Sequence, residues 1–169
     1  MAQQRTRLSR VLTMTPEDQG VPRMRAEQDK LRRSFPGFRL VGRNGAIIAL
    51  VGEITTPVGN TYKVRINLPD GYPYGMPSVE TVDWRPSPPA PHQYSPTSLC
   101  VMHPRFWSSK YTLAYIVAKT ALWLAKYEIW RAHERWPGRN QHGDEYERPG
   151  AAGDDETAGF WAAITRAFD

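Results

Sequence analysis

The sequence predicts an α+β fold, and three patterns carry this prediction. Between residues 62 and 68, apolar side chains alternate with polar ones, which is the period of a strand with one buried face. Residues 46–54 form a second strand-like run that is rich in β-branched side chains. Residues 112–131 are broadly apolar, so we expect a long helix that is largely buried. A meander with one apolar face needs a covering layer, and this helix can supply it.

The other predicted elements follow in chain order. A helix-start signal at Thr15 is interrupted at Gly20, so the main first helix is expected at residues 21–34. Residues 38–41 indicate a short strand. Residues 85–96 hold five prolines, which fix the backbone and remove donors, so no regular structure is expected there. A loop of this length inside a compact domain is usually functional.

The bulk composition bounds the class of protein. The chain has 169 residues, which suits one domain with one core. Its 40% of hydrophobic and 23% of charged residues are ordinary for a globular protein. No apolar run reaches the ~18 residues of a membrane span, and the first residues lack the apolar core of a signal peptide. We therefore expect a cytoplasmic protein with no membrane partner.

Charge is spread unevenly along the chain. Residues 1–43 hold ten Lys and Arg against four acids, a net charge of +6, whereas residues 144–169 hold seven acids against two Arg, a net charge of −5. A basic front could bind nucleic acid, but residues 24–34 contain no interleaved aromatic side chains on which bases could stack. The cations of the first helix, Arg23 among them, are interpreted as a solvated face or a docking face for an acidic partner protein. We expect no nucleic-acid partner.

Cys100 is the only cysteine, so it can form no internal disulfide. It is therefore either a small buried hydrophobe or a group that does chemistry. The irregular, Pro-rich segment before it favours a position near the surface. We expect a nucleophile that solvent can reach.

The sequence gives little support for a phosphate-binding site, a metal site or a hydrolase site. The chain contains no Gly-rich phosphate loop, and its one Cys and four scattered His lack the usual zinc spacing, so no cofactor and no metal are expected. A cysteine hydrolase is a weaker alternative, because it needs a histidine beside the cysteine in space and is typically built on a longer chain.

Several motifs together resemble the ubiquitin-conjugating (E2) enzymes. In that family a Tyr-Pro-Phe-x-x-Pro-x-Val turn precedes a loop with the catalytic cysteine, then a Trp and a long helix. The matching features occur here in the same order: Tyr72-Pro73-Tyr74-Gly75-Met76-Pro77-Ser78-Val79, Leu99-Cys100, Trp107 and the helix from Thr112. The resemblance covers roughly Met24 to Tyr127. It is closest to divergent bacterial E2-like proteins of CBASS-type antiphage operons, encoded beside a nucleotidyltransferase that makes a cyclic-nucleotide signal.

The resemblance implies a fold and a reaction. The fold is the ubiquitin-conjugating (UBC-like) fold, with an N-terminal helix, a four-stranded antiparallel meander, a long active-site loop and a long C-terminal helix. The reaction is carriage of a C-terminal carboxyl as a thioester on Cys100, followed by transfer to an amine. The carboxyl belongs to a modifier or a partner protein, for which a CD-NTase (cyclic-nucleotide synthase) is the candidate, and an E1-like donor is implied upstream. Together with the charge distribution, the resemblance gives three expected segments: a basic lead-in (1–20), an E2-like catalytic domain (21–143) and an acidic flexible stretch with a short terminal helix (144–169).

The resemblance also suggests roles for individual residues. His92 stands for the family's first-motif histidine, which braces the loop, and both a structural and a catalytic role are open. It is followed by Gln93 and Tyr94 where the family has Pro-Asn, so one of these side chains or a backbone N–H must supply the oxyanion donor. His142 and Glu134 follow the long helix, where either could deprotonate or position an amine, or simply be surface residues.

The thiolate of Cys100 is expected to be favoured by its surroundings. Arg105 and His103 are near in sequence, and the positive end of the helix from Thr112 is expected to add to their effect. Trp107 is interpreted as a packing anchor. The main alternative function is a non-catalytic binding module on the same fold, although such modules typically lack the cysteine.

Overall fold

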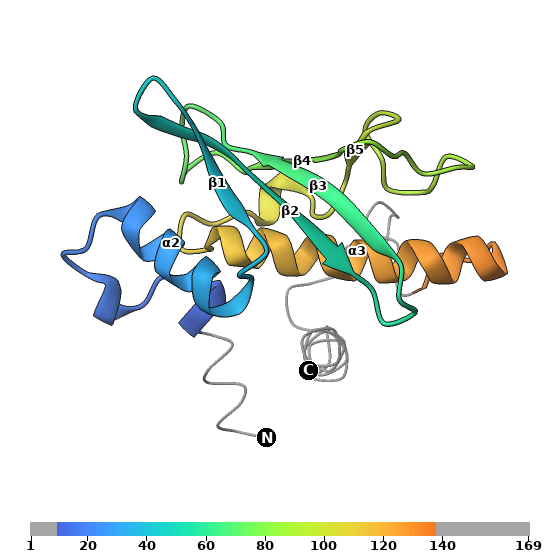
Figure 1. Ribbon diagram of the computed structural model, residues 1–169, viewed down its shortest axis with the longest axis horizontal. Helices are drawn as coiled ribbons and strands as arrows, with labels where there is room; N and C mark the ends of the chain where they lie inside the picture. Colours follow the sequence, from blue (N-terminus) through green and yellow to red (C-terminus); the bar gives the residue numbers. More distant parts are fainter. Residues whose placement is uncertain (1–9, 138–169) are drawn as a thin grey trace.

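The computed structural model describes residues 10–137 and confirms the α+β class. One layer is a five-stranded antiparallel sheet in chain order. Its strands are β1 (Arg39–Arg43), β2 (Ala46–Thr55), β3 (Thr61–Asn67), β4 (Ser78–Thr81) and β5 (Ser98–Leu99). The long helix α3 (Leu113–His133) runs beneath the sheet, and α2 (Arg23–Ser34) lies toward one end of the molecule (Figure 1). The chain also forms two short 3-10 helices, η1 (Pro16–Asp18) and η2 (Pro104–Phe106).

The fifth strand differs from the four-stranded meander that the resemblance implied. β5 has two residues: Leu99 pairs with Val79 and Ser98 with Glu80 of β4. Two residues are too few to show a strand period in the sequence, and Pro96 just before them indicates a break. Pairing with β4 anchors Leu99, which is 2% exposed, and thereby fixes the position of the next residue, Cys100.

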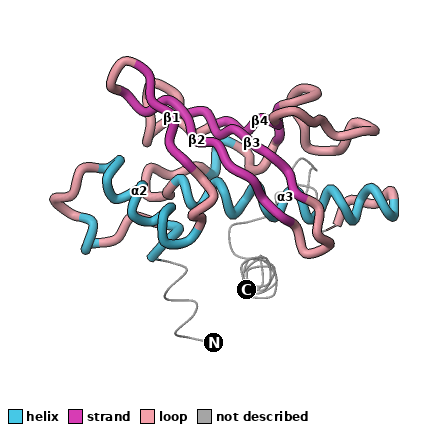
Figure 2. The backbone as a smooth tube through the Cα atoms, viewed as in Figure 1, coloured by secondary structure: helices cyan, strands magenta, loops and turns pink. Residues whose placement is uncertain are grey.

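The connection between β4 and β5 lacks helix and strand. Residues 82–97 follow a loop path at the end of the sheet that lies away from α2 (Figure 2). A single isolated bridge, Gln93 to Leu99, interrupts it. The prolines explain this course, because each one removes a backbone donor that a longer ladder would need.

The core lies between the sheet and α3. Side chains that are at most 1% exposed come from the strands (Leu50, Val64, Ile66, Val79) and from the helix (Leu113, Ile116, Val117, Leu124). The prediction of a largely buried long helix is therefore confirmed. On β2, Gly52 lies against the Phe38 ring, where an added Cβ would come within 2.6 Å of a ring carbon.

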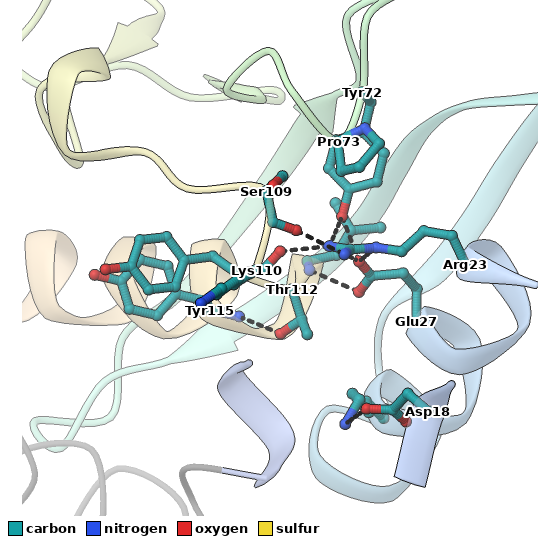
Figure 3. A network of polar contacts seen from close by, with 12 residues as sticks. Asp18, Arg23, Glu27, Tyr72, Pro73, Ser109, Lys110, Thr112 and Tyr115 are labelled. Atoms are coloured by element: carbon teal, nitrogen blue, oxygen red, sulfur yellow. Dashed lines mark hydrogen bonds and ion pairs between the residues drawn. The ribbon is translucent and has the colours of Figure 1, made fainter. Parts of the chain in front are cut away.

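A polar network joins α2 to the beginning of α3 (Figure 3). Glu27 is fully buried, and its carboxylate accepts hydrogen bonds from Arg23 Nε at 2.7 Å, from the Tyr72 hydroxyl and from the Leu113 amide at 2.8 Å. Arg23 Nη1 also donates to the carbonyl of Ser109 at 2.7 Å. Arg23 was expected on a solvated or docking face, but it points inward because Glu27 and the backbone of the α3 approach need its donors.

Residues 11–14 lie beside the segment that leads into α3. Leu12 is 2% exposed and belongs to the core, and its carbonyl accepts from the Thr112 amide at 3.1 Å. The Met14 amide donates to the Lys110 carbonyl at 2.7 Å. The acidic stretch and terminal helix expected over 144–169 lie outside the described residues. Within residues 10–137, none of the helices combines the length and apolar character that a membrane crossing requires.

Candidate active site around Cys100

Cys100 is placed by the short strand before it and by a closed turn of the loop. Its amide donates to the His92 carbonyl at 2.8 Å, and the Tyr94 amide donates to the Ser98 carbonyl at 2.9 Å. These bonds fold residues 92–100 back on themselves, so residues eight apart in the chain become neighbours. The position of the sulfur is thus set by backbone hydrogen bonds within the loop.

His92 connects this loop to α3. Its backbone is in the left-handed region at φ 60°, and its carbonyl accepts a second hydrogen bond from Trp123 Nε1 at 3.0 Å. Its ring lies 5.0 Å from the Trp136 ring, between centroids. These contacts show how His92 braces the loop, mainly through its carbonyl; a catalytic role for its ring stays a prediction.

Tyr94 contacts the sulfur directly. The Cys100 Sγ lies 3.2 Å from the Tyr94 hydroxyl oxygen, although the Tyr94 side chain is largely exposed. Burial of the hydroxyl, together with the contact to Cys100, raises the pKa of Tyr94 to about 12. The hydroxyl therefore stays protonated at neutral pH, and it can donate to a thiolate or to an oxygen beside the sulfur.

Gln93, the other side chain considered as a donor, is used inside the loop. Its Oε1 accepts from the Ala90 amide at 2.6 Å, and its Nε2 donates to the carbonyls of Ser95 and Pro96 at 3.3 and 3.4 Å. Of the two residues that replace the Pro-Asn of the E2 motif, the first shapes the loop and the second reaches the sulfur.

The expectation that Cys100 lies near the surface with a favoured thiolate is wrong. The residue is 4% exposed, because the pairing of Leu99 with β4 and the hydrogen bonds of the loop place it beside α3. Burial raises the pKa of the thiol, and the Tyr94 hydrogen bond only partly opposes this.

The groups expected to favour the thiolate make other contacts. The Arg105 guanidinium lies over the Phe106 ring at 4.8 Å, and the Arg105 amide donates to His103 Nδ1 at 3.2 Å. The Leu113 amide at the start of α3 donates to Glu27, so the N-terminus of this helix already faces a carboxylate.

Cys100 nevertheless lines a pocket. The pocket is bounded by the loop on one side and by α3 on the other, and its walls include His92, Cys100, Lys119, Trp123, Lys126 and Trp136. Trp136 comes after the end of α3, where Glu134 adopts the left-handed conformation at φ 55° and the chain turns. The Trp136 ring lies 5.5 Å from that of Trp123. The sulfur, although buried, therefore faces a space formed by aromatic and basic side chains.

The remaining predicted residues are only partly accounted for. Glu134 ends α3 through its backbone, whose amide donates to the Trp130 carbonyl at 2.7 Å. His142 lies outside the described residues. Trp107 is a packing anchor, as predicted: its Nε1 donates to the Pro73 carbonyl at 2.8 Å, and its ring lies 6.3 Å from that of Tyr72.

The two lysines of the pocket wall, Lys119 and Lys126, were not predicted from the sequence as site residues. Lys119 and Lys126 lie seven residues apart on α3, a spacing that places them on one face of the helix. That spacing was the available signal, but it does not reveal which face meets the loop. Among residues 10–137, no group of three or more His, Cys, Asp or Glu side chains is arranged to hold a metal ion.

The fold and the site together define a class of protein. A long helix buried against an antiparallel meander, with the only cysteine directly after the last strand, is compatible with the E2-like fold. Comparison with protein families identifies the family: the family model described as Type II CBASS E2 protein matches residues 27–143, and the chain belongs to this family. A comparison with curated proteins found no match.

Proposed function

We propose that this protein is an E2-like conjugating enzyme in which Cys100 carries an acyl group as a thioester. Membership of the Type II CBASS E2 family assigns an E2-like role in antiphage defence. The observation that carries the finer proposal is the site itself. The only cysteine of the chain lines a pocket, and a tyrosine hydroxyl lies 3.2 Å from its sulfur.

The first step is an exchange of thioesters. The Cys100 sulfur attacks the carbonyl carbon of a thioester on an E1-like donor and gives up its proton. The new C–S bond forms, the old one breaks, and the donor's thiol leaves with a proton. Two thioesters have nearly equal energies, so this step needs neither a nucleotide nor a metal ion at Cys100. The attacking species is the thiolate, and its low abundance in the free protein makes the surroundings of the sulfur decisive.

Tyr94 is proposed as the donor that stabilises the oxyanion. The tetrahedral intermediate places a negative oxygen on the carbon bonded to Sγ, and a donor fixed beside the sulfur can reach that oxygen. The Tyr94 hydroxyl lies in this position, and its pKa of about 12 keeps it protonated at neutral pH. It would take the place of the asparagine that the E2 motif carries and this chain lacks.

The second step is transfer to an amine. The amine nitrogen attacks the thioester carbon, the C–S bond breaks and an amide forms, while Cys100 regains a proton. His92 would hold the loop through its carbonyl, and its ring, Glu134 and His142 are proposed to position or deprotonate the amine. The acyl group is proposed to be the C-terminus of a modifier or of a partner protein, such as the CD-NTase of the same defence system. The catalytic unit is proposed to be residues 21–143.

The proposal predicts an adduct on Cys100. Intact mass measurement of the protein purified from its native cells should show an acyl adduct that reductant removes from the wild type. Cys100→Ala should lack the adduct, and Cys100→Ser should carry a reductant-resistant ester. Thr97→Ala, a change at an exposed position in the same loop, is the matched control and should retain the adduct. An adduct of the same mass on Cys100→Ala would refute the proposal.

A second candidate function is a non-catalytic binding module, and the burial of Cys100 favours it. A thiol that is 4% exposed and has a raised pKa is also what a purely structural cysteine shows. If Cys100→Ala protects cells from phage as well as the wild type does, the binding module is the better description. Loss of protection with retained folding supports the conjugating enzyme.

A further inference from the structure

Two lysines of α3 line the pocket that contains Cys100. Lys119 and Lys126 are separated by two helical turns, so their backbones lie about 10 Å apart along the helix axis on one face. Both side chains are half-buried, and Lys119 Nζ lies 5.6 Å from the centre of the Tyr115 ring. Between them, Trp123 is held by its hydrogen bond to the His92 carbonyl. The two cations therefore flank the part of α3 that meets the cysteine loop.

The pocket wall is basic. Among its described residues none is acidic, and α3 contains one carboxylate, Glu128. Glu128 points toward the strands, where it accepts hydrogen bonds from Thr56, Asn60 and Tyr62 at 2.7, 2.9 and 3.1 Å. A recess walled by two cations attracts anions.

We propose that Lys119 and Lys126 select the acyl donor, and that the donor is a C-terminal peptide with acidic side chains next to the carbonyl that Cys100 attacks. This inference rests on the proposed function of Cys100 as an acyl acceptor. The lysines bind the acidic side chains and so place the adjacent carbonyl at the sulfur. A lysine side chain is long and flexible and ends in a compact charge, so these two lysines can bind acidic side chains at different distances from that carbonyl.

A pair of alkylating reagents tests the charge of the pocket without any partner. Iodoacetate is an anion and iodoacetamide is neutral, and both react with the thiolate of Cys100. The rate constant for iodoacetate divided by that for iodoacetamide is therefore independent of the thiolate fraction, and it rises with a positive potential at the sulfur. The ratio for the wild type should exceed that of N-acetylcysteinamide, and added salt should lower it. Lys119→Gln/Lys126→Gln should reduce it by about threefold to tenfold.

Matched variants separate charge from folding. Lys110→Gln removes an exposed lysine outside the pocket wall and should leave the ratio unchanged. Lys119→Arg/Lys126→Arg keeps both charges and should also preserve it. The salt titration needs no variant and answers the question even if the double glutamine variant fails to fold. The inference would be overturned if the wild-type ratio equalled that of N-acetylcysteinamide, or if it were the same in the wild type and in Lys119→Gln/Lys126→Gln.

Peptide thioesters test the substrate class. N-acetylcysteamine thioesters of acetyl-Glu-Glu-Gly, acetyl-Gln-Gln-Gly and acetyl-Lys-Lys-Gly have the same neutral leaving group. In the reaction Cys100 Sγ bonds to the glycine carbonyl carbon, and N-acetylcysteamine leaves with the thiol proton. Intact mass should show faster acylation by the acidic peptide than by the neutral one, and Lys119→Gln/Lys126→Gln should remove this preference. Equal rates for all three peptides would contradict the inference about substrate.

The two experiments distinguish the failure of one proposal from that of the other. If no peptide acylates Cys100 and protein from native cells also carries no adduct on it, while the alkylation ratio still depends on the lysines, the acyl-carrier function fails and the anion-binding pocket stands. If all three peptides acylate Cys100 at equal rates, the acyl-carrier function stands and the selection by Lys119 and Lys126 is refuted.

Discussion

At the scale of single residues, the reactivity of Cys100 depends on two opposing effects. Burial raises the pKa of the thiol, and the hydrogen bond with Tyr94 lowers it in part. Both come from the protein's own packing rather than from the nearby Arg105 and His103. A thiol of this kind reacts slowly with electrophiles and oxidants, because little of it is thiolate at neutral pH.

The first prediction concerns the pH dependence of alkylation. Only the thiolate reacts, so a raised pKa lowers the reactive fraction at every pH below it. At pH 7 a smaller fraction of Cys100 than of a free cysteine is therefore thiolate, and its rate with iodoacetamide should be lower than that of a free cysteine. The rate should continue to rise beyond pH 9. A plateau below pH 8 would contradict the raised pKa.

Tyr94→Phe provides a second test of what controls the reactivity of Cys100. It removes the hydroxyl that stabilises the thiolate, so the alkylation rate at pH 8 should fall by about threefold to tenfold, the loss of one weak hydrogen bond to a charged group. Tyr74→Phe, which changes another exposed tyrosine, should leave the rate unchanged. An unaltered rate in Tyr94→Phe would show that its hydroxyl does not act on the sulfur.

At the scale of elements, the end of α3 closes the pocket. Glu134 adopts the left-handed conformation, and Trp136 then packs against His92 and Trp123. Because Trp136 and Cys100 line the same pocket, the segment after the helix contributes to the burial of the sulfur.

Trp136→Ala should therefore expose the sulfur. Removing the indole admits water to the pocket, which lowers the desolvation of the thiolate and the steric barrier to reagents. We expect alkylation of Cys100 by iodoacetamide at pH 8 to accelerate by about tenfold, since one pKa unit changes the thiolate fraction tenfold. Trp130→Ala removes an indole that packs on Tyr127 and lies outside the pocket wall, so it should change the rate little. Equal acceleration in both variants would indicate general loosening instead.

At the scale of the whole molecule, one buried carboxylate joins α2 to α3. Glu27 of α2 receives donors from Arg23, Tyr72 and the Leu113 amide (Figure 3). It therefore joins α2, the turn before β4 and the beginning of α3, three segments far apart in the chain. The same contacts set where α3 begins, and α3 in turn supplies Trp123 to the cysteine loop.

Glu27→Leu should destabilise the protein. The apolar side chain leaves the Leu113 amide, the Tyr72 hydroxyl and the Arg23 guanidinium without their shared acceptor. We expect the free energy of unfolding in urea to fall by about 3 kcal/mol. Asp29→Leu breaks only surface ion pairs with Arg25 and Arg32 and should cost less than about 1 kcal/mol. Equal losses in the two variants would show that the network contributes no more than a surface pair.

Much of the fold could be predicted because the pattern of neighbouring residues in the sequence indicates each of the longer elements. The alternation over residues 62–68 and the apolar character of residues 112–131 gave β3 and α3, since strand and helix periods are visible in neighbouring residues. The order of the turn at Tyr72, Cys100 and Trp107 gave the family. β5 was not predicted, because two residues carry no period. Arg23 was placed on a solvated or docking face, because its partners are as many as 88 residues away.

The sequence by itself determined the α+β class, the E2 family and the identity of the one cysteine, because each follows from periodicity, motif order or counting. Only the tertiary structure decided that this cysteine is buried, that Tyr94 rather than Gln93 reaches it, and that Lys119 and Lys126 share its pocket. The physical reason is that the solvation and charge around a sulfur depend on which distant side chains pack against it. Here those side chains come from α3 and from Trp136 beyond it.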